Sequence, residues 1–427
     1  MFLYLKNHMF QGTNSVANLG SFIFGISGVI ISLVVVIAPF KILQILSNDS
    51  IKIFGFELEK NGALGVLLIS GVVAAAITQP IAGNMSDKIM TKFGKRLPFI
   101  MVSGFGTSIS IITLYYIKTF PLLILSWVLI QFFANFGEGP ANALLKDHVS
   151  EKKFGEASGK FNLLRVLGAV FTLIIVLQLM NIYYRTLDER WFLAGLIFLS
   201  SLLTTTTIWS YFSLKNIKLI EVVQNPLDNN NSNRNLNLFL IVLTFSITLT
   251  AFSSLQSYAY FLLRDILVLE NPTNMMTYVI IILGLSIGLS IVPAGKLSDK
   301  YSRKYIIYGG GITGGLSCFL IIAFHNPIMV LILCSGIGIA VGSMFGTIWA
   351  LTNDVISKKN AGRQIGLMSF GFLFSGIASR GAGIIIDYLN NINQNLGYFS
   401  LIGLAGFCFI IAPITASMIK NNNNGSL

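Results

Sequence analysis

Four ionisable side chains lie within stretches of the sequence that are otherwise apolar: Glu138, Arg165, Arg380 and Asp387. A charge in such surroundings is costly, so each of them is a candidate for function. A carboxyl group removed from water exchanges its proton closer to neutral pH than it does in water. Glu138 is therefore the candidate for proton coupling, and the alternative is that it forms a structural ion pair with Arg165.

The other three charges also allow more than one role. Arg165 could hold an anionic substrate or pair with Glu138. Arg380 and Asp387 are separated by about two helical turns, which places them on one face of a helix. That spacing favours a structural pair or a gate formed by these two residues.

Uncharged polar and aromatic side chains in the central apolar runs are candidates for contacting a substrate. Amides and aromatic faces suit a neutral, hydroxylated solute such as a sugar, because stacking and hydrogen bonds together hold such a molecule. The alternative for each residue is packing between helices, which polar residues also serve. The candidates are Gln79, Gln131, Asn135, Asn142, Gln256, Tyr258, Tyr260, Trp349 and Asn353.

A loop with a glycine, an aspartate four residues later and an adjacent lysine occurs twice, each time with further basic residues behind it. A carboxylate at a helix end can accept hydrogen bonds from a neighbouring helix N-terminus and can pair with arginine. We therefore expect a conformational latch centred on Asp87 and Asp299, and the alternative is a solvated charged loop. The candidate latch residues are Gly83, Asp87, Lys88, Gly94, Arg96, Gly295, Asp299, Lys300 and Arg303.

The composition indicates that a membrane surrounds the elements that carry these residues. Of 427 residues, 54% are hydrophobic and only 11% are charged, and the mean hydropathy is +0.75. An ordinary soluble domain has about 25% charged residues, so a soluble enzyme, a nucleic-acid-binding protein and a disordered protein are excluded. The net charge of +12 fits loops that face an anionic membrane surface.

Twelve runs reach the length of about 20 apolar residues that a membrane helix needs. An asparagine-rich stretch separates the first six from the last six, so we expect an N-terminal bundle over 1–214, a cytoplasmic linker over 215–236, a C-terminal bundle over 237–420 and a disordered tail over 421–427. The runs cover about 18–45, 62–83, 97–117, 121–143, 161–181, 191–213, 237–262, 275–295, 305–324, 327–349, 364–386 and 398–419.

The two halves repeat each other with the same orientation. The loops after runs four and ten also agree, with Asp147 and Asp354 in matching places. Six runs per copy bring both copies into the membrane the same way up, which is one of the known plans of transporters. Lysine and arginine are concentrated in the loops on the side of the termini, so both termini are expected in the cytoplasm. Gly338, Gly342 and Gly346 predict a close helix contact.

With these motifs the chain resembles the major facilitator superfamily over essentially its whole length. The loop of the second half, Gly295 to Lys304, is similar to the family's loop motif, with serine in place of one glycine, and the copy in the first half carries an insertion before Gly94. The segments SDKIMTKFGKRLPFI and EGPANALLKD resemble the glycoside–pentoside–hexuronide and sucrose-type cation symporters. The resemblance implies an all-α membrane protein with two pseudo-symmetric six-helix bundles.

Two departures from those symporters bear on the coupling ion. The acidic residues that glycoside-type symporters carry in span two align with Ala75 and Gln79, and the aspartate of sucrose-type carriers aligns with Gln131. A sodium site of that kind is therefore not expected, and a proton is the favoured coupling ion.

We accordingly expect a monomeric secondary active transporter of the cell membrane that moves a sugar-like or glycoside-like solute by alternating access. The alternatives are an exporter of drugs or metabolites and a non-transporting scaffold or sensor of the same fold. An enzyme would need clustered acidic or histidine motifs, and His8, His148 and His325 have no metal-ligand spacing. No cofactor, metal or nucleic acid is expected.

Overall fold

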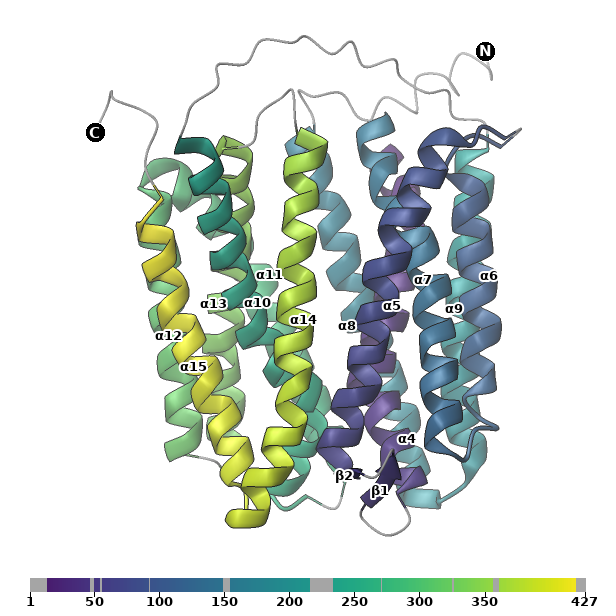
Figure 1. Ribbon diagram of the computed structural model, residues 1–427, viewed down its shortest axis with the longest axis vertical. Helices are drawn as coiled ribbons and strands as arrows, with labels where there is room; N and C mark the ends of the chain where they lie inside the picture. Colours follow the sequence, from purple (N-terminus) through teal and green to yellow (C-terminus); the bar gives the residue numbers. More distant parts are fainter. Residues whose placement is uncertain are drawn as a thin grey trace. The chain divides into compact units, whose positions relative to one another are not determined.

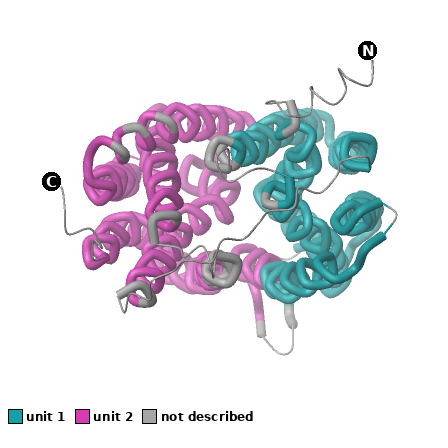
Figure 2. Tube along the Cα trace, turned by 90° about the horizontal axis from the view of Figure 1, so that it is seen from above, with its two compact units in different colours: residues 1–51, 70–223 teal, residues 52–69, 224–427 magenta. Residues whose placement is uncertain are grey.

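The computed structural model describes residues 14–46, 50–53, 56–91, 93–148, 154–215, 233–269, 271–324, 326–355 and 361–419. These residues form helices almost throughout (Figure 1). They divide into two compact units, one with residues 1–51 and 70–223 and the other with residues 52–69 and 224–427 (Figure 2). The predicted linker and tail lie mostly outside the described residues, so the expected domain boundaries stay a prediction.

In unit 1, α6 packs on α7 and α9, and α3 packs on α8 and α9. Close approach of α3 and α8 depends on small residues, since a Cβ atom on Gly168 would lie 2.1 Å from the carbonyl oxygen of Phe24. The helices of unit 1 are α2 (Asn14–Leu19), α3 (Ser21–Ser32), α4 (Ala38–Ile45), α6 (Leu97–Thr113), α7 (Phe120–His148), α8 (Phe154–Thr186) and α9 (Glu189–Leu214).

Unit 2 is built in the same manner, with α11 against α13, α12 against α13 and α15, and α10 against α14 and α15. The close contact predicted for the glycines of α13 is confirmed, because a Cβ atom on Gly342 would lie 2.7 Å from the carbonyl oxygen of Ile287 in α11. The helices of unit 2 are α10 (Asn233–Ile266), α11 (Thr273–Lys300), α12 (Arg303–Ala323), α13 (Pro327–Val355), α14 (Ala361–Ile392) and α15 (Leu396–Ser417).

Helix α5 (Lys60–Lys88) belongs to both units. Its residues up to Ile69 group with unit 2, and its residues from Ser70 onward group with unit 1. A two-stranded sheet of β1 (Ser50–Ile53) and β2 (Phe56–Glu59) directly precedes it. The sequence did not predict this short hairpin, which is too small to show a strand periodicity.

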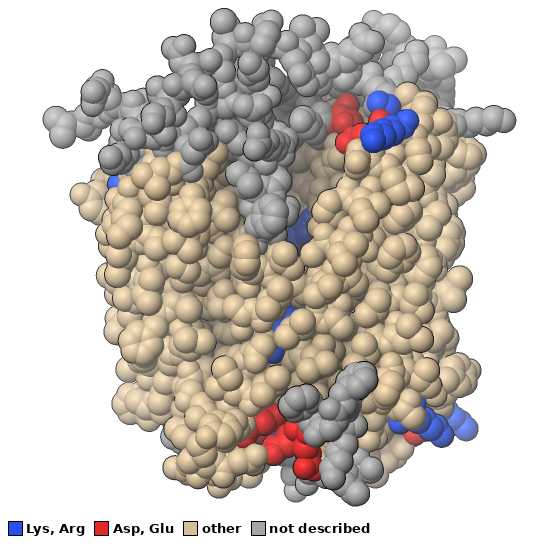
Figure 3. Space-filling view, in the orientation of Figure 1, with Lys and Arg blue, Asp and Glu red and all other residues tan. Residues whose placement is uncertain are grey.

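Eleven helices in the described part of the chain are long and apolar enough to cross a membrane. The remaining predicted run, 97–117, forms the shorter apolar helix α6, which ends at Thr113. The N–H groups of Leu114, Tyr115 and Tyr116 bond to carbonyl oxygens three residues back, so the chain continues as a tighter turn. In Figure 3 most charged atoms lie near the ends of the helices, and the band between them is mostly uncharged. The fold is therefore that of a multi-pass membrane protein.

The first span contains a departure from the regular helix that the sequence did not predict. A π-helical turn, η1 (Leu33–Ile37), lies between α3 and α4. All five of its residues are buried. A π turn inserts one residue and so rotates everything that follows by about 100°.

Candidate functional site

Four of the predicted polar residues lie on one face of α7 in unit 1. Gln131, Asn135, Glu138 and Asn142 follow one another at spacings of four, three and four residues, which is the repeat of a helix face. The Asn135 side-chain amide donates hydrogen bonds to the Gln131 backbone oxygen at 2.8 Å and to its side-chain oxygen at 3.2 Å. Gln131 and Asn135 thus bond to each other, whereas Glu138 and Asn142 bind the next helix.

Arg165 of α8 joins the two remaining residues of the stripe. Its Nη1 donates to Glu138 Oε1 at 2.8 Å and its Nη2 donates to Asn142 Oδ1 at 2.9 Å. The ion pair between Glu138 and Arg165 that the sequence suggested is therefore present. The Nε of Arg165 is buried and has no hydrogen-bond partner among the described residues. The Nε–H group of Arg165 is therefore a donor that no described acceptor uses.

The accessibility of this pair matters for its role. The side chain of Arg165 is 36% exposed and that of Glu138 is 21% exposed. Charged side chains within membrane helices face water-filled cavities or other protein groups, because hydrocarbon solvates them poorly. The pair can therefore meet water and a dissolved molecule.

Gln79 of α5 lies close to the same stretch of α7. A Cβ atom on Gly139 would be 3.1 Å from the Gln79 backbone oxygen and 3.2 Å from its Cγ. Gly139 thus permits the approach of the two helices, and the half-buried Gln79 packs against the residue that follows Glu138.

In unit 2 the predicted substrate contacts have several different surroundings. The Tyr258 hydroxyl donates to the backbone oxygen of Arg380, and the side chain is fully buried, so it packs α10 on α14. Tyr260 is likewise buried, and its ring meets Phe261 edge-on. Gln256 and Trp349 are half-buried, with Trp349 edge-on to another ring. The Asn353 side chain lies outside the described residues.

The expected pair of Arg380 and Asp387 does not form, because the two side chains bind different groups two turns apart. The Arg380 Nη1 donates only a long hydrogen bond, 3.4 Å, to the backbone oxygen of Gly376 in its own helix. Its Nε is buried without a hydrogen-bond partner in the described part of the chain. Arg380 therefore stands as a cation whose polar atoms are incompletely satisfied.

Asp387 of α14 instead caps the first turn of α5. Its Oδ1 accepts from the Asn61 side chain at 2.7 Å, and its Oδ2 accepts from the Gly62 backbone N–H at 2.5 Å. The first N–H groups of a helix lack partners within the helix, and the helix dipole favours a negative charge there. The carboxylate is 7% exposed, so the helix end takes the place of a basic partner.

The capped turn continues into a second buried contact. Tyr398 of α15 donates to Asp265 Oδ2 at 2.6 Å and also accepts from the Asn61 side chain at 3.1 Å. Asp265 in turn pairs with Lys60 at 2.6 Å. Sequence patterns alone did not identify four residues of this contact, although the two charges at the edges of apolar runs are a signal that could have found them. These residues are Lys60, Asn61, Asp265 and Tyr398.

The first copy of the loop motif forms the predicted ion pair. Arg96 Nη2 lies 2.6 Å from Asp87 Oδ1, its Nε donates to Asp147 at 2.8 Å, and its Nη1 donates to Ser86 at 2.5 Å. Burial alone would lower the pKa of Arg96, but the hydrogen bonds to Asp147 and Asp87 outweigh it and raise the pKa. Gly94, with φ at +90°, allows the turn that precedes Arg96.

The remaining candidate latch residues have fewer contacts than Arg96 in the described part of the chain. Lys88 is exposed, and a Cβ atom on Gly83 or Gly295 would meet nothing within 4 Å. Lys300 lies 5.6 Å from the ring centre of Tyr301. The Asp299 side chain lies outside the described residues, so a second-half counterpart of the Arg96 contacts stays a prediction, as does the role of Arg303.

Arg96→Lys is expected to lower the free energy of unfolding by about 2 kcal/mol, because one ammonium cannot replace three separately bonded nitrogens and charged hydrogen bonds are worth about 1.5–3 kcal/mol. Asp147→Asn should cost more than Asp87→Asn, since the Asp147 side chain is 22% exposed and the Asp87 side chain 63%. Chemical or thermal unfolding of purified protein measures both. Equal stability of the Arg96→Lys variant and the wild type would contradict this assignment.

Comparison with known proteins agrees with the fold described above. The sequence profile of the Major Facilitator Superfamily matches residues 19–380. A bacterial homologue of the human lysosomal transporter Spinster, solved inward-facing and occupied, has a TM-score of 0.69 at 12% identity, with 95% of this chain and 96% of that chain covered. The inward-facing, unoccupied structure has a TM-score of 0.66 at 12% identity, with 95% of both chains covered.

One curated relative shares sequence over a shorter stretch. The sucrose transport protein SUC4 of Arabidopsis thaliana is 28% identical over 123 residues, which is 25% of this chain and 24% of that protein. The chain thus matches about a quarter of the length of this relative. Since the family profile covers most of the chain, the protein belongs to the major facilitator superfamily and is a membrane transporter, not an enzyme.

Proposed function

We propose that this protein moves a small sugar-like or glycoside-like solute across the cell membrane by alternating access, driven by a proton gradient. The observation that carries the proposal is the partly exposed Glu138–Arg165–Asn142 group in unit 1, in which the buried Nε of Arg165 has no partner among the described residues. Buried polar groups without partners are rare, and each calls for a ligand, a water molecule or another explanation. An oxygen-rich solute supplies such an acceptor.

The solute class follows from the chemistry of the side chains near this group. Gln79 and Asn142 offer amide contacts, which suit the hydroxyl groups of a sugar. The partial likeness to a plant sucrose transport protein supports the same class. Tyr258 is no longer a proposed contact, since its hydroxyl is already bonded within unit 2.

Proton coupling is assigned to Glu138. When Glu138 binds a proton, its attraction for Arg165 falls and the guanidinium becomes available to a solute oxygen. When the proton leaves on the other side, the ion pair forms again and competes with the solute. A single carboxyl group and its arginine would in this way link proton movement to solute binding without a sodium site.

The orientation and the latch complete the proposal. With both termini in the cytoplasm, the loop of Asp87 and Arg96 lies on the cytoplasmic side, where the bonds from Arg96 to Asp87 and Asp147 hold the ends of α5, α6 and α7 together. A conformation in which these helix ends separate must break those bonds. The protein is proposed to act as a monomer.

Glu138→Gln is expected to abolish accumulation of solute driven by a pH gradient and to preserve solute exchange at equal pH, because glutamine can bind Arg165 but cannot take up a proton. Uptake of labelled sugars and glycosides by proteoliposomes measures both modes. Glu57→Gln, which changes an exposed glutamate of β2, serves as the matched control and should behave like the wild type.

Two results would count against the proposal in different ways. Wild-type protein that transports none of the sugars or glycosides under a pH gradient would exclude the solute class. A Glu138→Gln variant that still accumulates solute against its gradient would exclude Glu138 as the coupling residue and would leave the solute class standing.

A further inference from the structure

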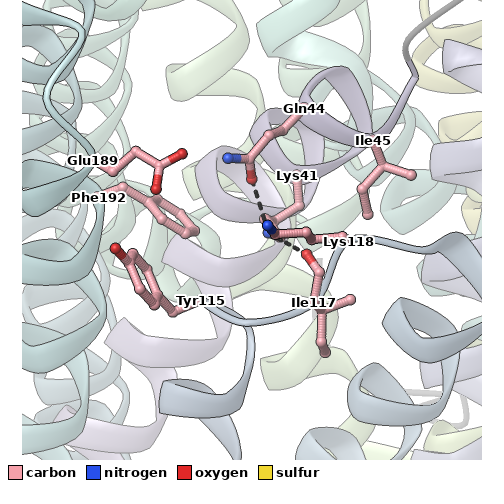
Figure 4. A pocket seen from close by; sticks show the side chains of 8 residues that line it. All are labelled: Lys41, Gln44, Ile45, Tyr115, Ile117, Lys118, Glu189 and Phe192. Carbon is pink, nitrogen blue, oxygen red and sulfur yellow. Dashed lines mark hydrogen bonds between the residues drawn. The ribbon is translucent and has the colours of Figure 1, made fainter.

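A pocket of about 190 Å³ lies in unit 1 (Figure 4). It adjoins the residues that follow the C-terminal end of α6, whereas Arg96 precedes the N-terminal end of that helix. Its walls come from the end of α4, from the joint between α6 and α7 and from the start of α9. Three charged side chains line it: Lys41, Lys118 and Glu189. None of them has a role in the transport mechanism proposed above.

Lys41 is the unusual member of this group, because it is 1% exposed. Its Nζ donates to Gln44 Oε1 at 2.8 Å and to the Ile117 backbone oxygen at 2.7 Å, and it lies 5.5 Å from the ring centre of Phe192. An ammonium group has three donors, so two neutral acceptors leave one donor without a hydrogen bond. No ion pair of Lys41 occurs among the described residues.

A π turn precedes the helix that carries Lys41 and sets the direction in which the Lys41 side chain points. The π turn η1 ends four residues before Lys41 and rotates α4 by about 100° relative to an unbroken α-helix. A buried charge is costly in a membrane span, and π turns within helices are rare and occur frequently at functional sites. Two such features next to one pocket indicate that the pocket binds something that stabilises the charge.

The lining favours an anion. Two cations and one carboxylate leave a positive balance, and Lys118 is exposed and free to turn toward a ligand. Figure 4 places the Glu189 carboxylate on the side of Tyr115 and Phe192, away from the nitrogen of Lys41. An anionic group of the ligand therefore has room next to Lys41 without meeting Glu189 first.

We propose that this pocket binds a phosphate group through Lys41 and Lys118. The pocket lies where the membrane-spanning helices end, which is the depth of lipid headgroups, and phosphate is the abundant anionic group there. The same chemistry could be supplied by a lipid headgroup or by free phosphate. The inference is independent of the solute and of proton coupling.

The test compares retention of anionic lipid by wild-type and variant protein. Protein is transferred from nanodiscs of phosphatidylglycerol and phosphatidylcholine into the mass spectrometer, and retained phosphatidylglycerol is counted. In a parallel arm, inorganic phosphate is added to delipidated protein and the unfolding temperature is followed. Stabilisation by inorganic phosphate alone would assign the site to the free anion, and retention of phosphatidylglycerol would assign it to the headgroup.

The Lys41→Met variant is expected to retain one phosphatidylglycerol fewer than the wild type, or to lose the stabilisation by inorganic phosphate. The Glu189→Gln variant is expected to bind the phosphate group at least twofold more tightly, because a repulsive charge is gone. Lys215→Met is the matched control, since Lys215 also lies over an aromatic ring, 4.8 Å from the centre of Phe212, but outside the pocket. Wild-type behaviour of Lys41→Met in both arms would overturn the proposal. So would weaker binding by Glu189→Gln, which remains a test if Lys41→Met fails to fold.

Discussion

Asp387→Ala is expected to lower the free energy of unfolding by about 3 kcal/mol. The substitution leaves the Asn61 side chain and the Gly62 N–H without their acceptor. An unsatisfied buried polar group costs about 1–3 kcal/mol, and loss of a helix N-cap costs about 1 kcal/mol. Because Asp387 is 7% exposed, water can replace the carboxylate only poorly.

The Asp387→Ala substitution should also weaken the hydrogen bonds of Tyr398, which contacts the same Asn61 side chain. Asn61 bonds to both Asp387 and Tyr398, and Tyr398 bonds to Asp265. Loss of one member therefore loosens the hold of α10, α14 and α15 on the first turn of α5. Hydrogen exchange of the α5 amides measures this directly and should rise at Asn61 and Gly62 before it rises in the rest of unit 2.

A matched control exists in unit 1. Asp188 caps α9 with the same chemistry, accepting from the Arg190 backbone N–H at 2.9 Å, but its side chain is 43% exposed. Asp188→Ala should therefore cost only about 1 kcal/mol, since water can solvate the freed N–H. Equal losses of stability in the two variants would mean that burial adds nothing to the Asp387 cap.

The positions of the helices could be predicted well, because each membrane span requires a long run of apolar residues that is visible in a single sequence. All twelve predicted runs correspond to helices, and only α6 is shorter than the length of a full span. The π turn η1 and the β1–β2 hairpin were missed. Both depend on packing and on turns of a few residues, which hydropathy does not record.

Site residues could be predicted where the residue type alone is informative, because an ionised side chain within a membrane span is energetically costly. Glu138 and Arg165 were predicted in this way, and the structure contains the ion pair between them. It failed for Asp387, whose acceptor role depends on Asn61, which is 326 positions away in the chain. Lys41 lies near the end of the predicted run 18–45 and was not among the candidate residues, yet the structure buries it.

Arg380→Met is expected to reduce solute uptake by about 10- to 100-fold and to leave folding intact. Arg380 has incompletely satisfied polar atoms, with one long bond to Gly376 and a buried Nε without a partner among the described residues. We expect the missing acceptor to be an oxygen of the solute, since a hydrogen bond to a charged group is worth about 1.5–3 kcal/mol. Uptake by proteoliposomes at several solute concentrations measures the change.

Stability separates this functional role from a structural one. A buried charge without a full set of partners destabilises the fold, so methionine should raise the free energy of unfolding by about 1 kcal/mol while uptake falls. Arg380→Lys keeps the charge but lacks the guanidinium fork, and it should recover only part of the uptake. Arg190→Met, whose side chain is 90% exposed in the wild type, controls for loss of an arginine. Loss of stability with normal uptake in Arg380→Met would show that the arginine supports the helix packing of unit 2 instead of the solute.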